Sequence, residues 1–278
     1  MMEIITSLQN PRIKFLIALQ QKSHERRQAG LFVVEGRREL MHCLEAGFTV
    51  DTVFWCPQVT TGTEPLPVLP AGVRVVEVSK AVYAKIAYRG STEGIVAEVR
   101  SRLLTLGDLR LSSSADPSSL QPSPLLVVLE GVEKPGNLGA VLRSADAAGV
   151  TAVIVCDPLT DLYNPNLIRS SVGAVFTVPT VACSSAECIA YLKSHGIQIL
   201  TAQLQDSSLY YATDMRRPTA IVMGTEATGL TPPWREAADA HIRIPMLGQI
   251  DSLNVSVSAA VLMYEAVRQR QASETGLF

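Results

Sequence analysis

Two polar loops of the sequence carry residues that could recognise or position a ligand. In the first, EKPGNLGAVLRSADAAG, Asn137 lies in a glycine-flanked turn and Arg143 follows further along the chain. A guanidinium group donates several hydrogen bonds from a planar fork, which suits phosphate and carboxylate groups. In the second, VMGTEATGL, Gly224 and Gly229 bracket Glu226, which could accept hydrogen bonds where the backbone approaches a ligand. Taken alone, each loop is also compatible with an ordinary turn whose charged side chains face solvent.

The stretch IPMLGQIDSLNVSVSAAVLMYEAVRQ places a polar group at the start of an apolar helix. The chain turns at Gly248, and the helix then opens with Ser252, Leu253 and Asn254. Ser and Asn are common at helix starts because their side chains satisfy unpaired backbone N–H groups. The helix that follows is apolar on most of its circumference, which is typical of burial in a core or a subunit interface.

Several common active-site motifs are absent from the sequence. There is no GxG, no GxxxxGK[ST] and no GxSxG, so the generic dinucleotide, P-loop and hydrolase loops are excluded. The five cysteines form no CxxC pair and the four histidines are scattered. We therefore expect neither a disulfide framework nor a metal site. No apolar run reaches the length of a membrane span, and no secretory signal is visible, so we expect a cytoplasmic protein.

The pattern of apolar runs predicts an α/β protein with a mainly parallel sheet in its C-terminal part. Continuously apolar strands alternate there with helices, and ligands on such sheets bind at the carboxyl ends of the strands. The predicted strands are LLVVLEGV, TAVIVCD, AVFTVPTVA, IQILTAQL, TAIVMG and HIRIP. In the N-terminal part the pattern predicts a helix over RIKFLIALQQKSHERRQ, and then alternating strands and helices up to GIVAEVR.

A Ser/Pro-rich stretch separates the two parts. We predict a first domain at 1–104, a linker at 105–123 and a second domain at 124–278. Lys and Arg outnumber Asp and Glu before this boundary, and the balance reverses after it. A small basic domain beside a more neutral one favours a nucleic-acid partner for the first domain.

Together the three polar stretches resemble the SpoU (TrmH) family of RNA ribose 2′-O-methyltransferases, in the SPOUT superfamily. NLGAVLRSADAAG, MGTEATGL and IPMLGQIDSLNVSVSAAVLMYEAVRQ look like its three ordered motifs, over roughly 125–270. NPRIKFLIALQ and GLFVVEGRREL also resemble the N-terminal domain of family members. The residues on the key motif positions are Asn137, Arg143, Gly224, Glu226, Gly229, Ser252, Leu253 and Asn254.

The resemblance implies a fold and a cofactor that the pattern of residues could not supply. It implies a deep C-terminal trefoil knot, a small ribosomal-protein-like RNA-binding domain at the N-terminus, and a homodimer through the last helix. It also implies S-adenosylmethionine as the cofactor and RNA as the substrate, with ribosomal RNA, in particular 23S, preferred over transfer RNA. The cofactor residues implied are Thr201, Gly224, Thr225, Glu226, Ile244, Met246, Gly248 and Leu253.

The implied reaction is in-line attack of a ribose 2′-oxygen on the cofactor methyl. Family members place the arginine at the position of Arg143 nearest the 2′-hydroxyl, as a base or as a phosphate ligand. We favour positioning, because arginine has a pKa above about 12. The implied catalytic residues are Asn137, Arg143, Glu226, Ser252 and Asn254, and the basic residues expected to bind RNA are Arg12, Lys14, Arg26, Arg27 and Arg37.

Three other functions remain compatible with the sequence. A non-catalytic RNA-binding protein of the same fold would be expected to have lost some motif residues. A base methyltransferase of the same superfamily fits the second and third motifs less well. A small-molecule methyltransferase would not need a basic N-terminal domain, and salt-sensitive RNA binding by that domain would separate it from the others.

Overall fold

The computed structural model describes residues 3–60, 66–87, 93–111, 123–225 and 228–274. The chain divides into two compact units, of which the first comprises Met1–Arg102 with Asp161–Thr177 and the second comprises Leu103–Thr160 with Val178–Phe278. The predicted methyltransferase domain therefore contributes a segment, Asp161–Thr177, to the first unit. Within the described residues, no helix is both long and apolar enough to cross a membrane.

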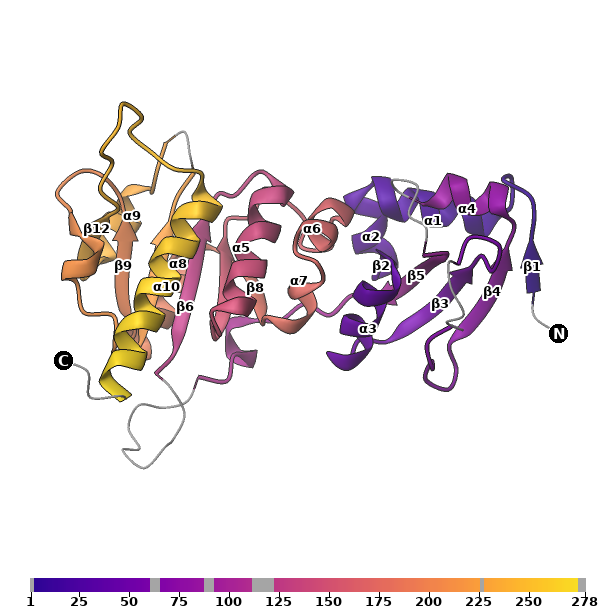
Figure 1. Cartoon of the computed structure of the whole chain (residues 1–278), viewed down its shortest axis with the longest axis horizontal. Helices are drawn as coiled ribbons and strands as arrows, with labels where there is room; N and C mark the ends of the chain where they lie inside the picture. Colours follow the sequence, from indigo (N-terminus) through magenta and orange to yellow (C-terminus); the bar gives the residue numbers. More distant parts are fainter. Residues whose placement is uncertain (1–2, 61–65, 88–92, 112–122, 226–227, 275–278) are drawn as a thin grey trace. The chain divides into compact units, whose positions relative to one another are not determined.

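The first unit is built on a mixed five-stranded sheet in the order β1-β4-β3-β5-β2 (Figure 1). β5 is antiparallel to both of its neighbours, whereas β1, β4 and β3 run parallel. Its strands are β1 (Glu3–Ile5), β2 (Leu31–Glu35), β3 (Val50–Trp55), β4 (Arg74–Val78) and β5 (Ile95–Arg100). Its helices are α1 (Pro11–Gln21), α2 (Ser23–Ala29), α3 (Arg37–Glu45), α4 (Lys80–Ile86), α6 (Pro165–Ser170) and α7 (Ala174–Thr177).

Aromatic rings hold the 161–177 segment in the first unit. Tyr163 stacks on Phe32, with ring centroids 4.2 Å apart, and Phe176 lies 5.8 Å from Phe32 and 5.3 Å from Phe48. The Tyr163 hydroxyl also accepts a hydrogen bond from the backbone N–H of Arg102 at 3.1 Å. Aromatic pairs of this kind contribute beyond the area they bury, so the segment is an integral part of this unit.

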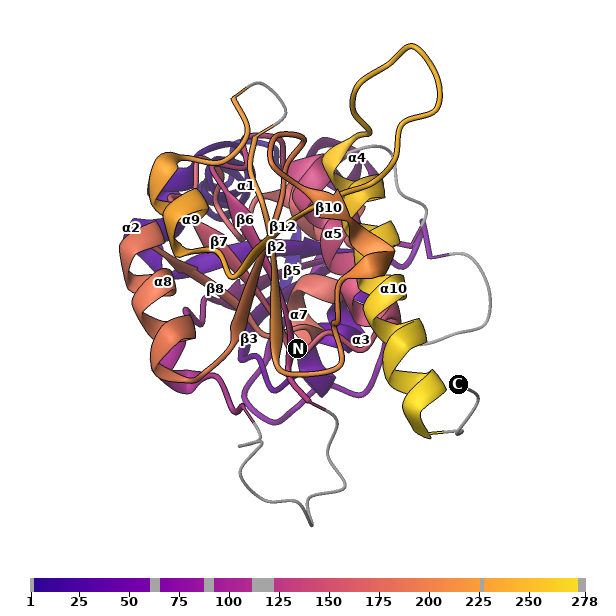
Figure 2. The ribbon, with the colours of Figure 1, turned by 90° about the vertical axis from the view of Figure 1, so that its left-hand side faces the viewer.

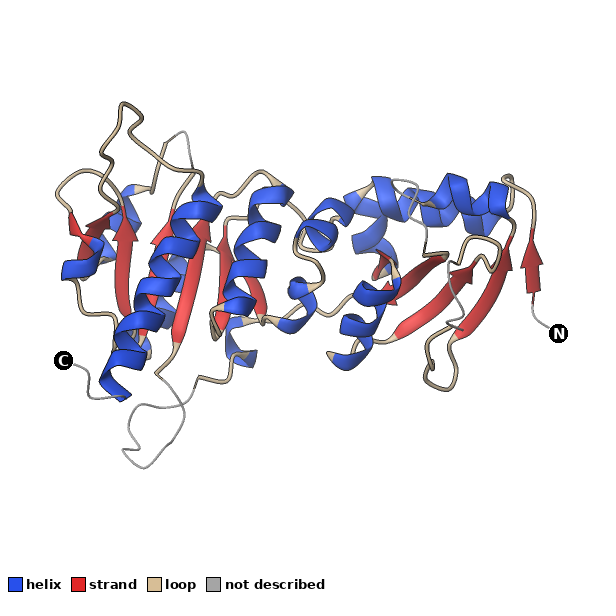
Figure 3. Ribbon diagram, in the orientation of Figure 1, coloured by secondary structure: helices blue, strands red, loops and turns tan. Residues whose placement is uncertain are grey.

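The second unit contains a seven-stranded sheet in the order β10-β12-β9-β11-β6-β7-β8, and every pair in it is parallel (Figure 3). This confirms the predicted α/β fold with a mainly parallel sheet. The strands are β6 (Leu125–Glu130), β7 (Ala152–Cys156), β8 (Thr180–Cys183), β9 (Gln198–Ala202), β10 (Ser208–Leu209), β11 (Thr219–Met223) and β12 (Ala240–Arg243). The helices are the 3₁₀ turns η1 (Leu106–Asp108) and η2 (Tyr210–Ala212), and α5 (Pro135–Ala147), α8 (Ser185–Ser194), α9 (Pro232–Ala237) and α10 (Val255–Glu274).

Helices cover both faces of this sheet. Figure 2 shows α5 and α10 on one face and α8 and α9 on the other. The central strands β6, β7, β9 and β11 have no exposed residue, which explains why they read as continuous apolar runs. Within α10, Ala259, Leu262, Met263 and Ala266 are buried, whereas Val257 is exposed. α10 is thus only partly a core helix.

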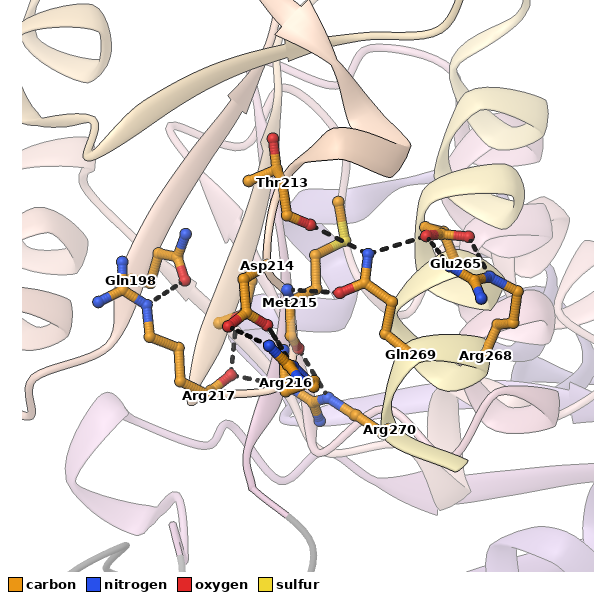
Figure 4. Close-up of polar contacts among 11 residues, drawn as sticks. Gln198, Thr213, Asp214, Met215, Arg216, Arg217, Glu265, Arg268, Gln269 and Arg270 are labelled. Atoms are coloured by element: carbon orange, nitrogen blue, oxygen red, sulfur yellow. Dashed lines mark hydrogen bonds and ion pairs between the residues drawn. The ribbon is translucent and has the colours of Figure 1, made fainter. Parts of the chain in front are cut away.

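The second half of α10 is fixed to the segment that precedes β11 (Figure 4). Gln269 accepts a hydrogen bond from the Met215 N–H at 2.8 Å and donates one to the Thr213 carbonyl at 3.0 Å. Arg270 donates to the carbonyls of Met215 and Arg217, at 3.0 and 3.1 Å. Its partial burial lowers the pKa of Arg270. These bonds anchor the second half of α10 to residues 213–217.

Two predicted elements differ in the structure. The helix expected over 12–28 is broken at Lys22, where the backbone is extended, and Arg26 of α2 donates to the Leu19 carbonyl at 2.6 Å, which satisfies the end of α1. The strand expected over 174–182 begins only at Thr180, because residues 174–177 form a helical turn that packs its aromatic side chain. The predicted linker lies partly outside the described residues, which omit 112–122.

Candidate active site

An apolar cavity of about 150 Å³ lies beyond the carboxyl ends of β9 and β12. The chain after β12 loops past these strand ends to the start of α10 (Figure 1). Ligands on parallel sheets bind at the carboxyl ends of the strands, so the position of this cavity is typical of a ligand site. Three residues of the predicted cofactor set line this cavity, namely Ile244, Met246 and Leu253. The other lining residues are Ala202, Gln203, Leu204, Ile242, Arg243, Asp251, Ser252, Ser258 and Leu262.

A second cavity, of about 240 Å³, lies between the loops that follow β6 and β11. We call it the Asn137 cavity. It contains Asn137 of the first motif and Gly224 and Thr225 of the second, so the fold brings these two motifs together. Its lining is Gly131, Val132, Glu133, Lys134, Asn137, Gly224, Thr225, Thr228 and Val255.

Four consecutive residues of the third motif join the two cavities. Ser252 and Leu253 line the apolar cavity, and Val255 lines the Asn137 cavity. Between them, the Asn254 side chain donates from Nδ2 to Oδ1 of Asn137 at 3.2 Å. Asn254 therefore lies in sequence between residues of the two cavities and contacts Asn137 of the second.

Asn254 also starts α10. Its Oδ1 accepts hydrogen bonds from the Ser256 N–H at 3.0 Å and the Ser256 hydroxyl at 2.6 Å. The capping function expected for this polar group is thus present, and it belongs to Asn254. Because the two carboxamide atoms have different partners, the same side chain caps the helix and contacts the first motif.

The glycines of the second motif permit a close approach of two backbone segments. A Cβ on Gly224 would lie 2.2 Å from the Gly229 carbonyl oxygen, and Gly229 has a φ of +68°. Thr225 and Gly229 exchange backbone hydrogen bonds of 3.2 and 3.0 Å, which close the loop. Glu226, predicted as catalytic and cofactor-binding, lies outside the described residues.

The buried carboxylate of Glu130 binds Thr231, two residues after this loop. Glu130, at the end of β6, accepts hydrogen bonds from the Thr231 N–H at 2.9 Å and from its hydroxyl at 2.6 Å. The Ser185 hydroxyl lies 3.2 Å from the same carboxylate and accepts from Trp234 Nε1 at 3.0 Å. Glu130 was not among the predicted site residues, although it is an acidic residue at the end of an otherwise apolar strand.

Arg143 lies outside both cavities. It is exposed on α5, about 9 Å along the helix axis from Asn137. Within the described residues its side chain makes no hydrogen bond or ion pair. Its guanidinium group is therefore available to a bound substrate.

Two predicted cofactor residues, Thr201 and Gly248, line neither cavity. The Thr201 side chain is fully buried, and its hydroxyl lies 2.6 Å from Nδ1 of His241 on the neighbouring strand. The Thr201 hydroxyl is thus already bonded inside the sheet, so the cofactor contact predicted at Thr201 would have to use its backbone. Gly248 lies in the exposed part of the loop, where an added Cβ would meet no atom within 4 Å.

The basic residues expected to bind RNA divide into two groups. Lys14 and Arg27 are exposed, Arg12 is partly exposed and pairs with Glu3, and Arg37 is partly exposed at the start of α3. The prediction for Arg26 is wrong. Its side chain is only 5% exposed, and its Nε lies 2.6 Å from Asp161 Oδ2, so it is a structural residue of the first unit.

Three of the five cysteines lie together in the second unit, which the sequence pattern did not indicate. The Sγ atoms of Cys156, Cys183 and Cys188 all lie within 4.8 Å of one another. The available signal was positional: Cys156 lies near the end of the predicted strand TAVIVCD, and Cys183 directly follows the predicted strand AVFTVPTVA.

Comparison with known proteins agrees with the two-part organisation. Residues 124–264 match the SpoU rRNA Methylase family, and residues 10–97 match an MRM3-like substrate binding domain. The chain is 37% identical over 205 residues to the 23S rRNA (guanosine-2′-O-)-methyltransferase RlmB of Vibrio vulnificus, an alignment that covers 73% of this chain and 81% of the relative.

Solved structures of similar proteins cover nearly the whole chain. An RNA 2′-O ribose methyltransferase is 40% identical, with a TM-score of 0.77, and the match covers 96% of this chain and 99% of the other. The AdoMet-bound rRNA methyltransferase of Sinorhizobium meliloti is 28% identical, with a TM-score of 0.83, over 96% and 98% of the two chains. The family match over half of the chain and the RlmB identity lead to one conclusion: the chain belongs to the SpoU rRNA methylase family.

Proposed function

We propose that this protein transfers a methyl group from S-adenosylmethionine to a ribose 2′-hydroxyl of 23S ribosomal RNA. The observation that carries this proposal is the contact between Asn254 and Asn137, because it joins the third motif, beside the apolar cavity, to the first motif in the Asn137 cavity. The names of the RlmB relatives support the choice of 23S ribosomal RNA, and with it a cytoplasmic location.

The apolar cavity fits the proposed cofactor. Ile242, Ile244 and Leu262 supply apolar surface for a flat ring system, while Gln203 carries a buried side-chain oxygen that has no hydrogen-bond partner among the described residues. Such a combination is typical of cofactor sites. The sulfonium of bound S-adenosylmethionine would supply an activated methyl group. The side chains named here would hold it, and Gly224 would let the second motif approach closely.

The polar residues would then position the acceptor ribose. Holding two reactants in the correct geometry can contribute about 7 to 11 kcal/mol, so positioning suffices as the main contribution. Asn254 and Asn137 would fix the loops on either side of the acceptor, and Ser252, on the cofactor side, would add a hydroxyl. Arg143, exposed and without a partner in the described chain, would bind an RNA phosphate and stabilise charge near the 2′-oxygen. Glu226 remains part of this proposal on the family motif alone.

The first unit would bind the RNA. Its match to a substrate-binding domain and its exposed Lys14 and Arg27 support this function. Folded RNA is recognised largely by shape and by phosphate contacts, which a small basic domain can supply.

We further propose a trefoil knot and a homodimer. The strand order supports the knot, because β11 lies between β6 and β9, which both precede it in sequence. Apolar side chains on α10 and its leading loop support the dimer, since Val257, Tyr264 and Ile250 are exposed by 48, 50 and 72%. Light scattering coupled to size exclusion would test the dimer directly.

The deciding experiment is methyl transfer from labelled S-adenosylmethionine to unmodified 23S ribosomal RNA and, in parallel, to transfer RNA. We expect label on the ribosomal RNA, mapped to a ribose, and its loss in Arg143→Ala with cofactor affinity unchanged. Arg143→Lys tests whether the planar fork is needed. Label on transfer RNA alone would show that transfer RNA, and not 23S ribosomal RNA, is the substrate. Absence of label in either RNA, with cofactor bound, would favour a non-catalytic RNA-binding protein, and full activity of Arg143→Ala would favour a different catalytic arrangement.

A further inference from the structure

The carboxyl ends of β7 and β8 carry three thiols that the proposed methyl transfer does not use. Cys156 ends β7 and Cys183 ends β8, and the two residues are direct neighbours in the register of this parallel pair. Cys188 lies in the first turn of α8, which begins at Ser185. The three Sγ atoms lie within 4.8 Å of one another, so three separate elements converge on one point.

The spacing of the sulfurs suits a common metal ion. A Zn²⁺–thiolate bond is about 2.3 Å long, so three thiolates around one ion have sulfurs about 3.8 to 4.0 Å apart. The observed spacing, within 4.8 Å, is therefore reached by side-chain movements below about 1 Å. Thiolates are the ligands that soft and borderline metal ions prefer.

The surroundings favour thiolates at this point, but only a limited number. The cluster lies at the N-terminus of the ten-residue α8, where the helix dipole favours negative charge. Three thiolates around a divalent ion carry a net charge of −1, whereas three thiolates around a monovalent ion carry a net charge of −2. Because buried charge is costly, the divalent ion is favoured.

The exposure of the cluster leaves one coordination position open. Cys156 and Cys188 are fully buried, and Cys183 is partly exposed. Within the described chain no further His, Cys, Asp or Glu belongs to the group. Three protein ligands and one water make a complete tetrahedral set for Zn²⁺.

We propose that Cys156, Cys183 and Cys188 bind one divalent thiophilic ion of the zinc type. Each thiol that coordinates the ion releases its proton to solvent, and no oxidation or reduction takes place. The ion ties the carboxyl ends of β7 and β8 to the first turn of α8. It thereby fixes both ends of the connection that contains residues 161–177, independently of methyl transfer.

The test uses the full chain, reduced and stripped of metal, titrated with Cd²⁺ and Co²⁺ as spectroscopic substitutes for Zn²⁺. We expect one Cd²⁺ per chain with a sulfur-to-metal charge-transfer band, and visible bands of tetrahedral Co²⁺ that Zn²⁺ abolishes. Cys183→Ser, at the partly exposed position, should bind Cd²⁺ at least about tenfold more weakly. Loss of a residue that only hydrogen-bonds to a metal ligand already weakens metal binding about tenfold, so loss of a ligand should cost at least as much.

Two further variants make the test specific. Cys188→Ala should also lose the band, with its fold checked by circular dichroism, whereas Cys43→Ala, which removes a thiol of the first unit, should titrate like the wild type. No charge-transfer band in the wild type would overturn the proposal. So would a band that persists in both cluster variants, or a disulfide that forms in the cluster under these conditions in place of ion binding.

Discussion

Asn254 donates a hydrogen bond from its Nδ2 to Oδ1 of Asn137, 117 residues earlier in the sequence, at 3.2 Å. Its Oδ1 meanwhile accepts from the N–H and the hydroxyl of Ser256 at the start of α10. The donor atom therefore serves the contact between motifs, and the acceptor atom serves the helix. This division allows the two functions to be separated by substitution.

Asn254→Asp should abolish the contact with Asn137 and keep the cap of α10. A carboxylate still accepts the capping bonds, so we expect the free energy of unfolding to change by less than about 0.5 kcal/mol. The donor to Asn137 is lost and two acceptors now face each other. Because small displacements at a reacting centre can cost about 100-fold, we expect a loss of methyl transfer of that order, measured with labelled cofactor.

Asn254→Ala is the matched variant, since it loses both functions. It should lose activity to a similar degree and also about 1 kcal/mol of stability in urea unfolding. Methyl transfer by Asn254→Asp at the wild-type rate would show that the contact with Asn137 does not serve the reaction.

The sequence predicted the parallel sheet well because its strands are buried on both faces. β6 (Leu125–Glu130) and β7 (Ala152–Cys156) have no exposed residue, and such strands appear as uninterrupted apolar runs. β1 (Glu3–Ile5) and β4 (Arg74–Val78) were not predicted. They are short and carry charged, partly exposed residues, so their pattern resembles that of a loop.

Tertiary contacts explain what the sequence could not predict. Residues 174–177 have strand-like composition but form a helical turn, because Phe176 packs against Phe32 and Phe48 of the first unit. The thiol cluster depends on the register of Cys156 beside Cys183, which no local spacing encodes. The motif residues were found through their resemblance to a family, whereas Asn254 between two cavities emerged only from the fold.

Glu130→Gln should loosen the second motif. A carboxamide has one acceptor oxygen where the carboxylate has two, so one donor of Thr231 would face an NH₂ group. For a residue that is 5% exposed, an unsatisfied donor costs about 2 kcal/mol, and we expect a loss of stability of that size in urea unfolding. Thr231→Val removes only the hydroxyl and should cost about 1 kcal/mol. Unchanged stability of Glu130→Gln would mean that this carboxylate does not support the loop.

Arg26 and Arg27 are neighbours with opposite expected effects. Arg26→Met leaves Asp161 without its buried partner, and we expect a loss of about 3 kcal/mol in the free energy of unfolding. The folded variant should bind RNA normally. Arg27→Ala, at an exposed position, should leave stability unchanged but weaken RNA binding and reduce its logarithmic salt slope by about one. If Arg26→Met were as stable as the wild type but bound RNA more weakly, Arg26 would be an RNA-binding residue and not a structural one.

Glu98 should make the first unit less stable as pH rises. Its side chain is 6% exposed, and one carboxyl oxygen has no hydrogen-bond partner among the described residues. Burial, aided by the charge of Asp51, raises the pKa of Glu98 from 4.5 to about 7. The folded state therefore holds its proton more tightly than the unfolded state. The resulting stability is fully present below pH 4.5 and is lost as pH rises to about 7, and it amounts to about 3 kcal/mol.

Urea unfolding at pH 5 and pH 8 tests this sign, with Trp55 as the reporter of the first unit. The chain contains two tryptophans, so Trp234→Phe in every protein compared leaves Trp55 alone. Glu98→Gln should remove most of the loss of stability between the two pH values, because a neutral carboxamide stands in for the protonated acid. Glu236→Gln, at an exposed position of the second unit, should retain that loss. If Glu98→Gln kept the full pH dependence, another group would have to cause it, and burial of Glu98 would have no energetic consequence in this range.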